Sequence, residues 1–424
     1  YDRLPTPVGL VRNGVAPDHQ KIKSVTKAFD RVAKKPGFRF FGNVSLGEDI
    51  SVDDLRQHYH QIVYTTGAQT DKNLNIPGID LKNSHAATEF VAWYNGHPDF
   101  RHLEFDLSQE RVAVIGVGNV AVDVCRILSR SVDELATTDI ADYALDALRE
   151  SKVKEVYMLG RRGPAQAAFT APEIKELGEM EGADIVISED DAALDPLSEA
   201  ALADADRGTL RKVEIIQAHA HKPLEGKPRK LIVRFLVSPT ALTADEEGSV
   251  ACMHLVHNEL YQTDAGTLRP RSTEKTEELP VGLVFRSIGY RGVPLPGVPF
   301  NDSWGVILNE KGRVIDSDSQ NPVIGEYTAG WIKRGPSGVI GTNKPDAAET
   351  VALMLEDVAH GRILSPAQPT AGAALKLVAQ KQPRFVTYAD WQRLDEMEVS
   401  RGEAQGRPRV KFVDVDEMLT ALDK

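Results

Sequence analysis

A glycine turn at residues 116–121 has the residue types and the spacing that hold the pyrophosphate of a dinucleotide. Its sequence is Gly116-Val117-Gly118-Asn119-Val120-Ala121. In such a turn the first glycine permits a tight bend, the second lets the backbone approach a phosphate, and a small third residue keeps helix and strand close. The N–H groups and the positive end of the following helix would face the phosphates. A glycine turn alone is a weak signal, so the elements around it decide its meaning.

Two arginines, Arg161 and Arg162, follow the next predicted strand and indicate which dinucleotide binds. In an NAD site an acid usually stands here for the ribose 2′-hydroxyl, whereas guanidinium groups suit the 2′-phosphate of NADP(H). About 40 residues separate the glycines from the arginines, where about 20 are usual. Residues 132–150 have helical spacing and predict an inserted helix in that interval. The alternative is a glycine turn in another α/β fold, followed by two solvated arginines.

The elements that must position these residues alternate between strand and helix. Residues 112–115 and 153–160 are apolar enough for buried strands, and residues 120–128 continue at helical spacing. Further helices are predicted at residues 24–34, 53–58, 89–94, 172–180, 190–207 and 347–360. Further strands are predicted at residues 38–46 (running into a turn), 61–66, 185–188, 283–288 and 326–330. Alternating residues in the ranges 212–220, 230–237, 249–261 and 269–277 predict an antiparallel hairpin region, with His219 and His221 on a strand surface.

Length and composition restrict the classes of protein. The 424 residues suggest two or three domains, and 42% hydrophobic residues can bury a sizeable core. A net charge of −12 argues against nucleic acid as the main partner. Cys125 and Cys252 lie far apart, and no cluster of ligands predicts a metal site. We predict neither a membrane-spanning helix nor a signal peptide, because no stretch approaches ~18 uninterrupted apolar residues.

Five motifs occur in an order that resembles a known family. They lie at residues 10–19 (LVRNGVAPDH), 40–43 (FFGN), 160–164 (GRRGP), 286–292 (RSIGYRG) and 330–344 (GWIKRGPSGVIGTNK). On these motifs the chain resembles the adrenodoxin reductase-like ferredoxin–NADP(+) reductases, FAD enzymes of the glutathione-reductase structural class. The resemblance extends from Leu4 to at least Gly361 and is strongest to actinobacterial members, which share a similar C-terminal extension.

The resemblance implies an α/β fold with two Rossmann-like nucleotide-binding domains. Residues 1–70 and 287–424 would form a discontinuous FAD-binding domain, and residues 71–286 an inserted NADP-binding domain. It also implies hydride transfer from NADPH to FAD, then one-electron transfer to a ferredoxin-type iron–sulfur protein. The alternatives are an electron-transfer flavoprotein like the glutamate synthase small subunit, or a non-catalytic NADP(H)-binding chain. We further expect a monomer in the cytoplasm.

The resemblance also assigns residues to the two cofactors. Besides Gly116 and Val117 of the turn, it places Gly118, Asn119 and Val120 on the NADPH pyrophosphate, and Arg161, Arg162 and Glu173 on the adenosine part. Lys72 falls where relatives often have an arginine in the linker. Val44 would contact FAD through its backbone, and the flavin ring would lie along Trp331, Gly338, Val339 and Ile340. His19 and Glu176 match a catalytic pair beside the flavin, although a loop histidine is more often only hydrogen-bonded.

Basic residues that meet an acidic ferredoxin are harder to predict. The candidates are Lys21, Lys23, Lys27, Arg31, Lys333 and Arg334. A run of lysines is usually a solvated face, so a docking role and a merely solvated surface remain alternatives.

The chain departs from the family pattern at its start. In relatives a strand, a glycine turn, a helix and a second strand ending in an acid precede the position of Leu4, and such a βαβ unit takes about 30 residues or more. Those parts grip the FAD pyrophosphate. We therefore expect the printed chain to hold FAD poorly and to expose a sheet edge that invites aggregation, whereas the NADPH domain should still fold.

Overall fold

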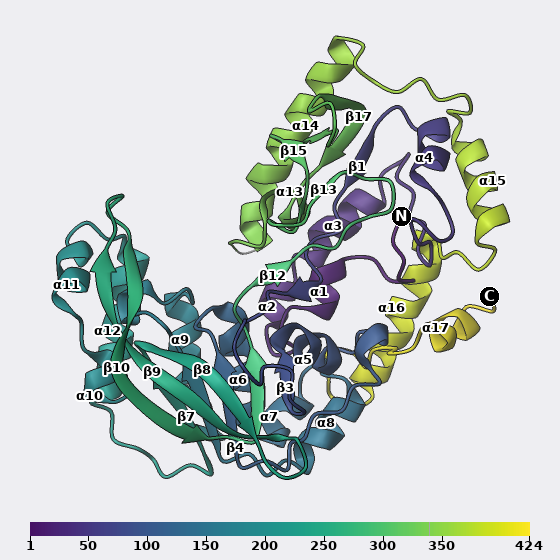
Figure 1. Cartoon of the computed structure of the whole chain (residues 1–424). Coiled ribbons are helices and arrows are strands. Elements are labelled where there is room, and N and C mark those ends of the chain that lie inside the picture. The colour runs from purple at the N-terminus through teal and green to yellow at the C-terminus, as the bar shows by residue number, and fades with distance from the viewer. Residues whose placement is uncertain (339) are drawn as a thin grey trace.

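A six-stranded parallel sheet, here called the large sheet, forms one of the two lobes of the molecule (Figure 1). The computed structural model describes residues 1–338 and 340–424. In sheet order, the strands are β3 (Ser84–Ala86), β11 (Leu283–Arg286), β4 (Arg111–Ile115), β5 (Glu155–Leu159), β7 (Arg229–Arg234) and β6 (Ala183–Val186). Every neighbouring pair is parallel. The predicted strands around the glycine turn and before the arginine pair are therefore confirmed.

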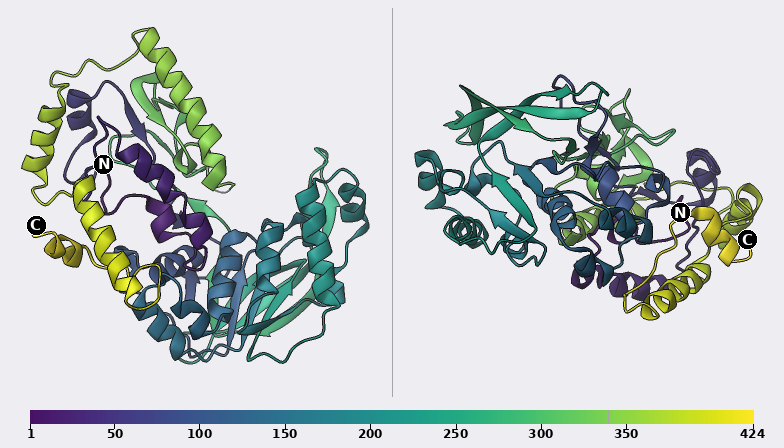
Figure 2. Two further views of the ribbon diagram at one scale, coloured as in Figure 1. Left: turned by 180° about the vertical axis from the view of Figure 1, so that it is seen from behind. Right: turned by 90° about the horizontal axis from the view of Figure 1, so that it is seen from below.

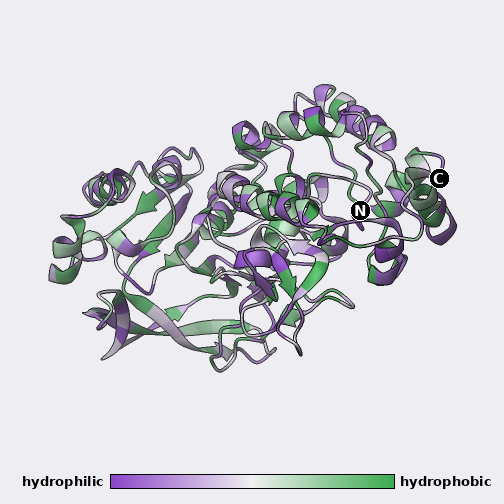
Figure 3. Ribbon diagram, turned by 90° about the horizontal axis from the view of Figure 1, so that it is seen from above, coloured by the Kyte–Doolittle hydropathy of each residue, from purple (hydrophilic) through white to green (hydrophobic). Residues whose placement is uncertain are grey.

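The two faces of the large sheet are covered by different layers. Side chains alternate between faces along a strand, and Val112 and Val114 of β4 pack in the core beneath the helices. Ala113 and Ile115 point the other way, into a second core with residues of an antiparallel sheet. The helices over the first face include α5 (Ala87–Tyr94), α6 (Asn119–Ser129), α8 (Asp142–Arg149), α9 (Ala171–Leu177) and α12 (Arg207–Ala220). Figure 3 shows both hydrophobic and hydrophilic residues along the helices and strands of the molecule.

The antiparallel sheet consists of β8 (Val237–Ala244), β9 (Val250–Gln262) and β10 (Leu268–Pro280). This confirms the hairpin region predicted for residues 249–261 and 269–277. The same prediction is wrong for residues 212–220, which belong to helix α12, and for most of residues 230–237, which form parallel strand β7. The Asp206 carboxylate accepts hydrogen bonds from the N–H groups of Gly208 and Thr209 and so starts α12. Consequently His219 lies on a helix and His221 at its C-cap, not on a strand.

Two predicted single helices are each divided in two. Residues 132–150 form α7 (Val132–Ala136) and α8, and residues 190–207 contain α10 (Glu189–Ala192) and α11 (Pro196–Leu202) before α12 begins. Pro196 is the first residue of α11, and the preceding Asp195 is extended, as residues before proline prefer. The strand predicted within residues 38–46 is also wrong, because that stretch has only isolated bridges, Gly42 to Val386 and Leu46 to Ile50.

The second lobe is built on a four-stranded sheet, here called the small sheet. Its order is β1 (Ile62–Tyr64), β17 (Pro322–Thr328), β16 (Arg313–Ile315) and β15 (Asn309–Glu310). Only the β1–β17 pair is parallel. The short strands β13 (Phe300–Asn301) and β14 (Val306–Ile307) pair nearby. Helices of this lobe are α1 (Gly9–Asn13), α2 (Gln20–Lys23), α3 (Thr26–Ala33), α4 (Val52–His58), α13 (Trp331–Arg334) and α14 (Asn343–Ala359).

Two kinds of connection join the lobes. The chain crosses twice between them, at β2 (Thr70–Asp71) and β12 (Tyr290–Arg291), and these strands pair with each other. The C-terminal residues form α15 (Ala371–Lys381), α16 (Tyr388–Glu403) and α17 (Val415–Ala421). Figure 2 shows α16 running along the back of the molecule from one lobe to the other. The domain boundaries at residues 70/71 and 286/287 stay a prediction, and the C-terminal extension contacts both lobes.

No helix in the described part of the chain is long and apolar enough to cross a membrane. Cys125 is buried and Cys252 partly buried, and both are free thiols.

Candidate dinucleotide and redox site

The glycine turn lies at the carboxyl edge of the large sheet, where the strand order reverses. On one side of β4 lies β5, the next strand of the sheet along the chain, and on the other lies β11, the last one. Ligands of open α/β sheets bind at such a switch point. The turn is held there because the Gly116 N–H donates to Leu159 O at 2.9 Å and the Ser287 N–H donates to Ile115 O at 2.8 Å.

The backbone of the turn requires glycine at one position and leaves space at another. Gly116 has a φ of +134°, and a Cβ there would lie 2.2 Å from the Ser287 carbonyl oxygen. A Cβ on Gly118 would meet nothing within 4 Å, so the N-terminus of α6 is open to an approaching group. Gly118 is the N-cap residue, and no side chain caps the first turn. These features fit a pyrophosphate on the N–H groups of α6.

Val117 and Asn119 of the turn form hydrogen bonds with the segment before α9. The Val117 carbonyl accepts hydrogen bonds from the N–H groups of Ala168 and Phe169, at 2.9 and 3.0 Å. The Asn119 amide oxygen accepts from the Thr170 N–H at 3.2 Å, just before α9. The side-chain oxygen of Asn119 therefore holds the start of α9, whereas its backbone N–H and side-chain NH2 group stay available for a phosphate.

Arg161 and Arg162 lie at the same carboxyl edge, directly after β5. Arg161 is exposed and Arg162 partly buried, and neither side chain forms an ion pair or hydrogen bond within residues 1–338 and 340–424. Their backbone is fixed, because Arg161 O accepts from the Asn258 amide and Arg162 O from the Leu236 N–H. Burial and the charge of Arg161 lower the pKa of Arg162. Two neighbouring cations without a carboxylate partner fit the dianionic 2′-phosphate of NADP(H).

The predicted pair of His19 and Glu176 is brought together across 157 positions of sequence. His19 Nε2 lies 2.9 Å from Glu176 Oε2, and His19 Nδ1 lies 4.0 Å from Asp123 Oδ1. The His19 side chain is 12% exposed, whereas that of Glu176 is 41% exposed. The pair thus joins a buried ring to a carboxylate that a cofactor can reach.

Behind this pair lies a buried arginine that none of the sequence motifs indicated. Arg126 of α6 has a fully buried side chain whose guanidinium is within 4.0 Å of several carboxylates. These carboxylates are Asp18, Asp123, Glu173 and Glu176. The available signal was a lone arginine within the mostly apolar run of residues 120–128.

Glu173 lies with this cluster and not beside the arginine pair. Its carboxylate is 3.7 Å from Arg126 Nη1, and burial and the Asp123 charge raise its pKa. Atoms of His19, Asp123 and Glu173 all lie within 4.8 Å of one another. The contact between Glu173 and the adenosine part of NADPH stays a prediction, and the described neighbours of Glu173 are Arg126, His19 and Asp123.

The loop after β17 contains the residues expected along the flavin ring. Gly330 and Gly338 have φ values of +78° and +76°, so the backbone adopts shapes that favour glycine. The Trp331 ring packs 5.4 Å from that of Tyr290, a residue the sequence reasoning did not select. Ile340 begins the 3-10 helix Ile340–Thr342 directly before α14. Val339 was also predicted here and lies outside the described residues.

The remaining predicted contacts are placed as follows. Val44 is buried, and its N–H donates to Asp2 O at 3.0 Å. Lys72 is exposed, and its N–H donates to Gly289 O at 2.9 Å in the crossing between the lobes. Both therefore stay predictions as cofactor contacts.

Two of the candidate docking lysines are unsuitable. Lys23 is buried with its ammonium 2.7 Å from Asp139, and buried Lys333 lies 2.6 Å from Glu349. Arg334 is only partly exposed and bonds to Ser337 at 2.7 Å. Lys21, Lys27 and Arg31 are exposed on α2 and α3.

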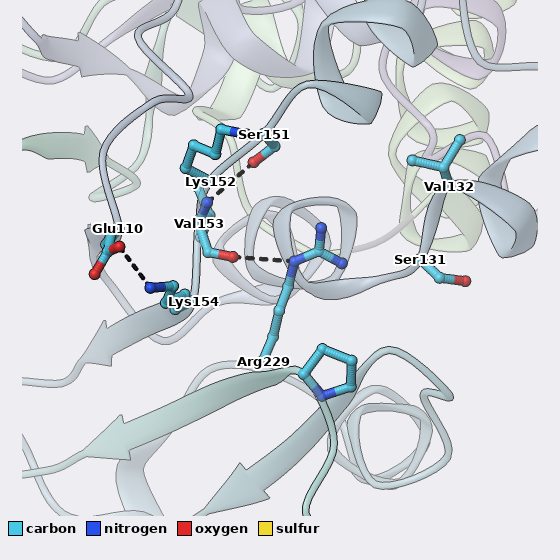
Figure 4. A pocket seen from close by; sticks show the side chains of 9 residues that line it. Glu110, Ser131, Val132, Ser151, Lys152, Val153, Lys154 and Arg229 are labelled. Carbon is cyan, nitrogen blue, oxygen red and sulfur yellow. Dashed lines mark hydrogen bonds and ion pairs between the residues drawn. The ribbon is translucent and has the colours of Figure 1, made fainter.

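A cavity of about 490 Å³ lies at the opposite, amino edge of the large sheet (Figure 4). Its lining includes Glu110, which pairs with Lys154 at 2.5 Å, and Arg229, whose Nε donates to Val153 O at 3.1 Å. Parallel sheets bind ligands at their carboxyl ends, and this cavity contains none of the predicted site residues.

Known proteins are similar to this chain over almost its whole length, although no protein-family model matches it. The chain is 46% identical to NADPH-ferredoxin reductase FprA of Mycobacterium leprae, covering 99% of this chain and 90% of that protein. It is 40% identical to the mitochondrial NADPH:adrenodoxin oxidoreductase of Arabidopsis thaliana, covering 99% and 89%. A solved structure of Mycobacterium tuberculosis FprA in complex with NADPH matches with a TM-score of 0.93 at 44% identity, covering 100% of this chain and 92% of that one.

These similarities confirm the predicted family resemblance, the α/β fold class and the assignment as an oxidoreductase. The chain belongs to the family of adrenodoxin reductase-like NADPH-ferredoxin reductases, which are enzymes that use FAD and NADP(H).

Proposed function

We propose that this chain oxidises NADPH and passes the electrons, one at a time, to a ferredoxin-type iron–sulfur protein. The observation that carries the proposal is the open glycine turn beside two arginines that have no carboxylate partner among the described residues, in a chain similar to ferredoxin reductases over 99% of its length. Bound FAD would supply the conversion of a hydride into single electrons. We assign FAD to residues 1–70 and 287–424, and NADP(H) to residues 71–286.

The residues on NADPH would have separate tasks. The backbone at Gly116, Gly118 and Val120 would bind the pyrophosphate at the N-terminus of α6, and Arg161 with Arg162 would bind the 2′-phosphate. His19 and Glu176 would meet the nicotinamide end, since the exposed part of Glu176 is the reachable side of the pair. Lys72, in the crossing between the lobes, would add a single ammonium contact to the nucleotide, not the bidentate contact that an arginine makes.

The residues that fit the flavin are those of the loop after β17. Gly330 and Gly338 allow the backbone to lie close to a flat ring, and Trp331 provides an apolar side chain beside it. Helix α14 has 17 residues and begins just after this loop, so its N-terminus can stabilise negative charge on the bound ring. Val44 would contribute a backbone contact.

The partner would be an acidic iron–sulfur protein of the ferredoxin or adrenodoxin type. The exposed cations Lys21, Lys27 and Arg31 are suitable for docking it, whereas Lys23 and Lys333 are already paired inside the molecule. The monomeric state and the cytoplasmic location stay predictions.

The test is an electron-transfer assay with the FAD-loaded protein. We expect anaerobic NADPH to bleach the flavin absorbance, and cytochrome c reduction to depend on added ferredoxin. NADH at the same concentration is the control. Flavin bleaching without any dependence on ferredoxin would contradict the proposed acceptor, and an absence of bleaching would contradict the proposed donor.

A further inference from the structure

The position of the His19 ring depends on a residue outside the reacting pair. His19 follows Asp18 in a loop and is the N-cap of α2, a helix of four residues, and its own side chain makes no capping bond. The hydrogen bond of 2.9 Å to Glu176 fixes only one ring nitrogen. Other contacts must therefore hold the loop against α6 and α9.

Arg126 provides those contacts with one guanidinium group. Its Nε and Nη2 donate to the two oxygens of Asp18 at 2.6 and 3.1 Å, and Nη2 also donates to Asp123 Oδ1 at 2.7 Å. Asp18 is the residue before His19, and Asp123 is the carboxylate beside His19 Nδ1. The same side chain thus fixes the backbone that carries the ring and the acid next to it.

The third nitrogen of Arg126 extends this arrangement to α9. Nη1 lies 3.7 Å from Glu173 and 4.0 Å from Glu176, the partner of His19. Arg126 therefore lies between the His19 loop, α6 and α9. Arg130, the C-cap residue of α6, lies on the same carboxylate, with Nε 3.2 Å from Asp18.

Asp18 and Arg126 keep each other ionised. Although burial would raise it, the charges of Arg126 and Arg130 lower the pKa of Asp18 to about 2. Asp18 therefore remains an anion at neutral pH. A guanidinium cannot give up its proton in this setting, so the contact persists whatever the protonation of His19 and Glu176.

We propose that Arg126 is a positioning residue that holds His19 in place against Glu176. The proposal rests on the role assigned to this pair under the proposed function. Arg126 is fully buried and acts through Asp18 and Asp123, so it is not itself a catalytic residue.

The first experiment measures flavin reduction by NADPH in a double-mutant cycle of the FAD-loaded protein. Displacing a reacting group by about 1 Å costs on the order of 100-fold in rate, so we expect Arg126→Gln to slow the limiting rate by up to that factor. NADPH affinity should change little. Adding Arg126→Gln to His19→Gln should cause no further loss. The proposal would be overturned if the rate losses of the two single variants multiplied in the double variant, or if Arg126→Gln lowered NADPH affinity at an unchanged rate.

The second experiment needs no catalysis and uses diethyl pyrocarbonate labelling read by mass spectrometry. His19 should be labelled several times faster in Arg126→Gln, whereas His221, with a 72% exposed side chain, should be labelled equally in both proteins. Unchanged labelling of His19 would overturn the proposal. If His19→Gln leaves flavin reduction unaffected, the proposed role of the pair fails, and the labelling still decides whether Arg126 positions the ring.

Two further variants serve as control and substitute. Arg12→Gln breaks another buried bidentate arginine–carboxylate pair, with Glu398, and should leave His19 labelling unchanged. If Arg126→Gln fails to fold, Asp18→Asn replaces it. This variant keeps the arginine but removes the negative charge of the Asp18 carboxylate, and it should likewise slow flavin reduction and speed the labelling of His19. Equal effects of Arg12→Gln and Asp18→Asn on His19 labelling would show a purely structural role.

Discussion

Two buried clusters of charged side chains join the N-terminal residues to the rest of the molecule. The His19 cluster comprises Asp18, His19, Asp123, Arg126, Glu173 and Glu176. The C-terminal cluster comprises Arg12, Lys23, Asp139, Glu398, Arg409 and Lys411. The first meets helices α6 and α9, and the second meets the C-terminal extension. Both bring residues from the first 23 positions of the chain onto the lobe of the large sheet.

The C-terminal cluster is closed. The Glu398 carboxylate is fully buried and accepts from Arg12 at 2.5 and 2.7 Å, from Arg409 at 3.0 Å and from the Phe412 N–H at 2.8 Å. The Lys411 ammonium donates to Arg12 O and Asn95 O at 3.2 and 3.0 Å. Such a satisfied network locks two segments together and has no side left for a ligand.

The His19 cluster is open by comparison. The Glu176 side chain is 41% exposed, and neither Arg126 Nη1 nor Glu173 Oε2 has a hydrogen bond within the described residues. Carboxylates also outnumber arginines in it. Similar ion pairs thus have two uses in this molecule, because a closed cluster fixes domain position whereas an open one keeps capacity for a bound group.

The largest expected effect comes from breaking the closed cluster. Glu398→Gln leaves the buried Arg12 guanidinium without its anion, which typically costs about 3–5 kcal/mol, and Arg409 keeps only its ion pair with Asp395. Urea unfolding should show that loss, while the flavin reduction rate of the folded protein stays near that of the wild type. A loss below about 1 kcal/mol would mean that the cluster does not hold the lobes.

The same cluster should make stability depend on acid. Burial alone would raise the pKa of the Glu398 carboxyl, but the charge of Arg12 lowers that pKa below its ordinary value. A depressed pKa stabilises the fold fully above the unfolded value of about 4.3 and less as the pH falls through the folded value. The unfolding free energy of the wild type should therefore fall more steeply below pH ~4 than that of Glu398→Gln. Parallel curves would contradict this.

The open cluster should respond in rate and not in stability. His19→Gln and Glu176→Gln are each expected to slow flavin reduction by NADPH by on the order of 100-fold, because a positioned acid–base group contributes about that much. Stopped-flow absorbance gives the rate, and its dependence on NADPH concentration gives the affinity. Glu179→Gln, a nearby glutamate with a 59% exposed side chain, is the matched control. Unchanged rates in both variants would return the pair to a structural role.

A smaller loss is expected at the arginine pair. Losing a charge-assisted hydrogen bond typically costs about 1.5–3 kcal/mol. The double variant Arg161→Ala, Arg162→Ala should therefore raise the KM for NADPH about tenfold or more. NADH lacks the 2′-phosphate and should be nearly unaffected, which makes it the internal control in steady-state kinetics. Equal losses for the two nucleotides would exclude recognition of the phosphate by this pair.

The smallest effect is expected at the amino edge of the large sheet. Lys154→Gln removes an ion pair with Glu110 in which both side chains are more than 60% exposed. Such pairs contribute about 0–1 kcal/mol, so the thermal midpoint and NADPH affinity should barely change. A marked loss of NADPH affinity would instead indicate that the nucleotide binds at the amino edge, which contradicts the proposed site at the carboxyl edge.

Sequence patterns predicted the parts of the site that depend on neighbours in the chain. Gly116 could be recognised because a tight turn after a buried strand requires a φ that only glycine tolerates, and the structure has +134° there. Arg161 and Arg162 could be recognised because they end the next strand. The prediction is wrong for residues 212–220, where alternating polarity favours a strand although Lys212, Val213 and Ile216 are buried at helical spacing.

By itself the sequence determined the glycine turn, the arginine pair and the family. Each depends on short-range spacing, which is set by backbone dihedral angles and the periods of helix and strand. Only the tertiary structure decided that Arg126 lies between Asp18, Asp123 and Glu176, and that Lys23 is buried against Asp139. Ion pairs between distant segments arise when packing of apolar faces brings the segments together, and no local pattern records which charges then meet.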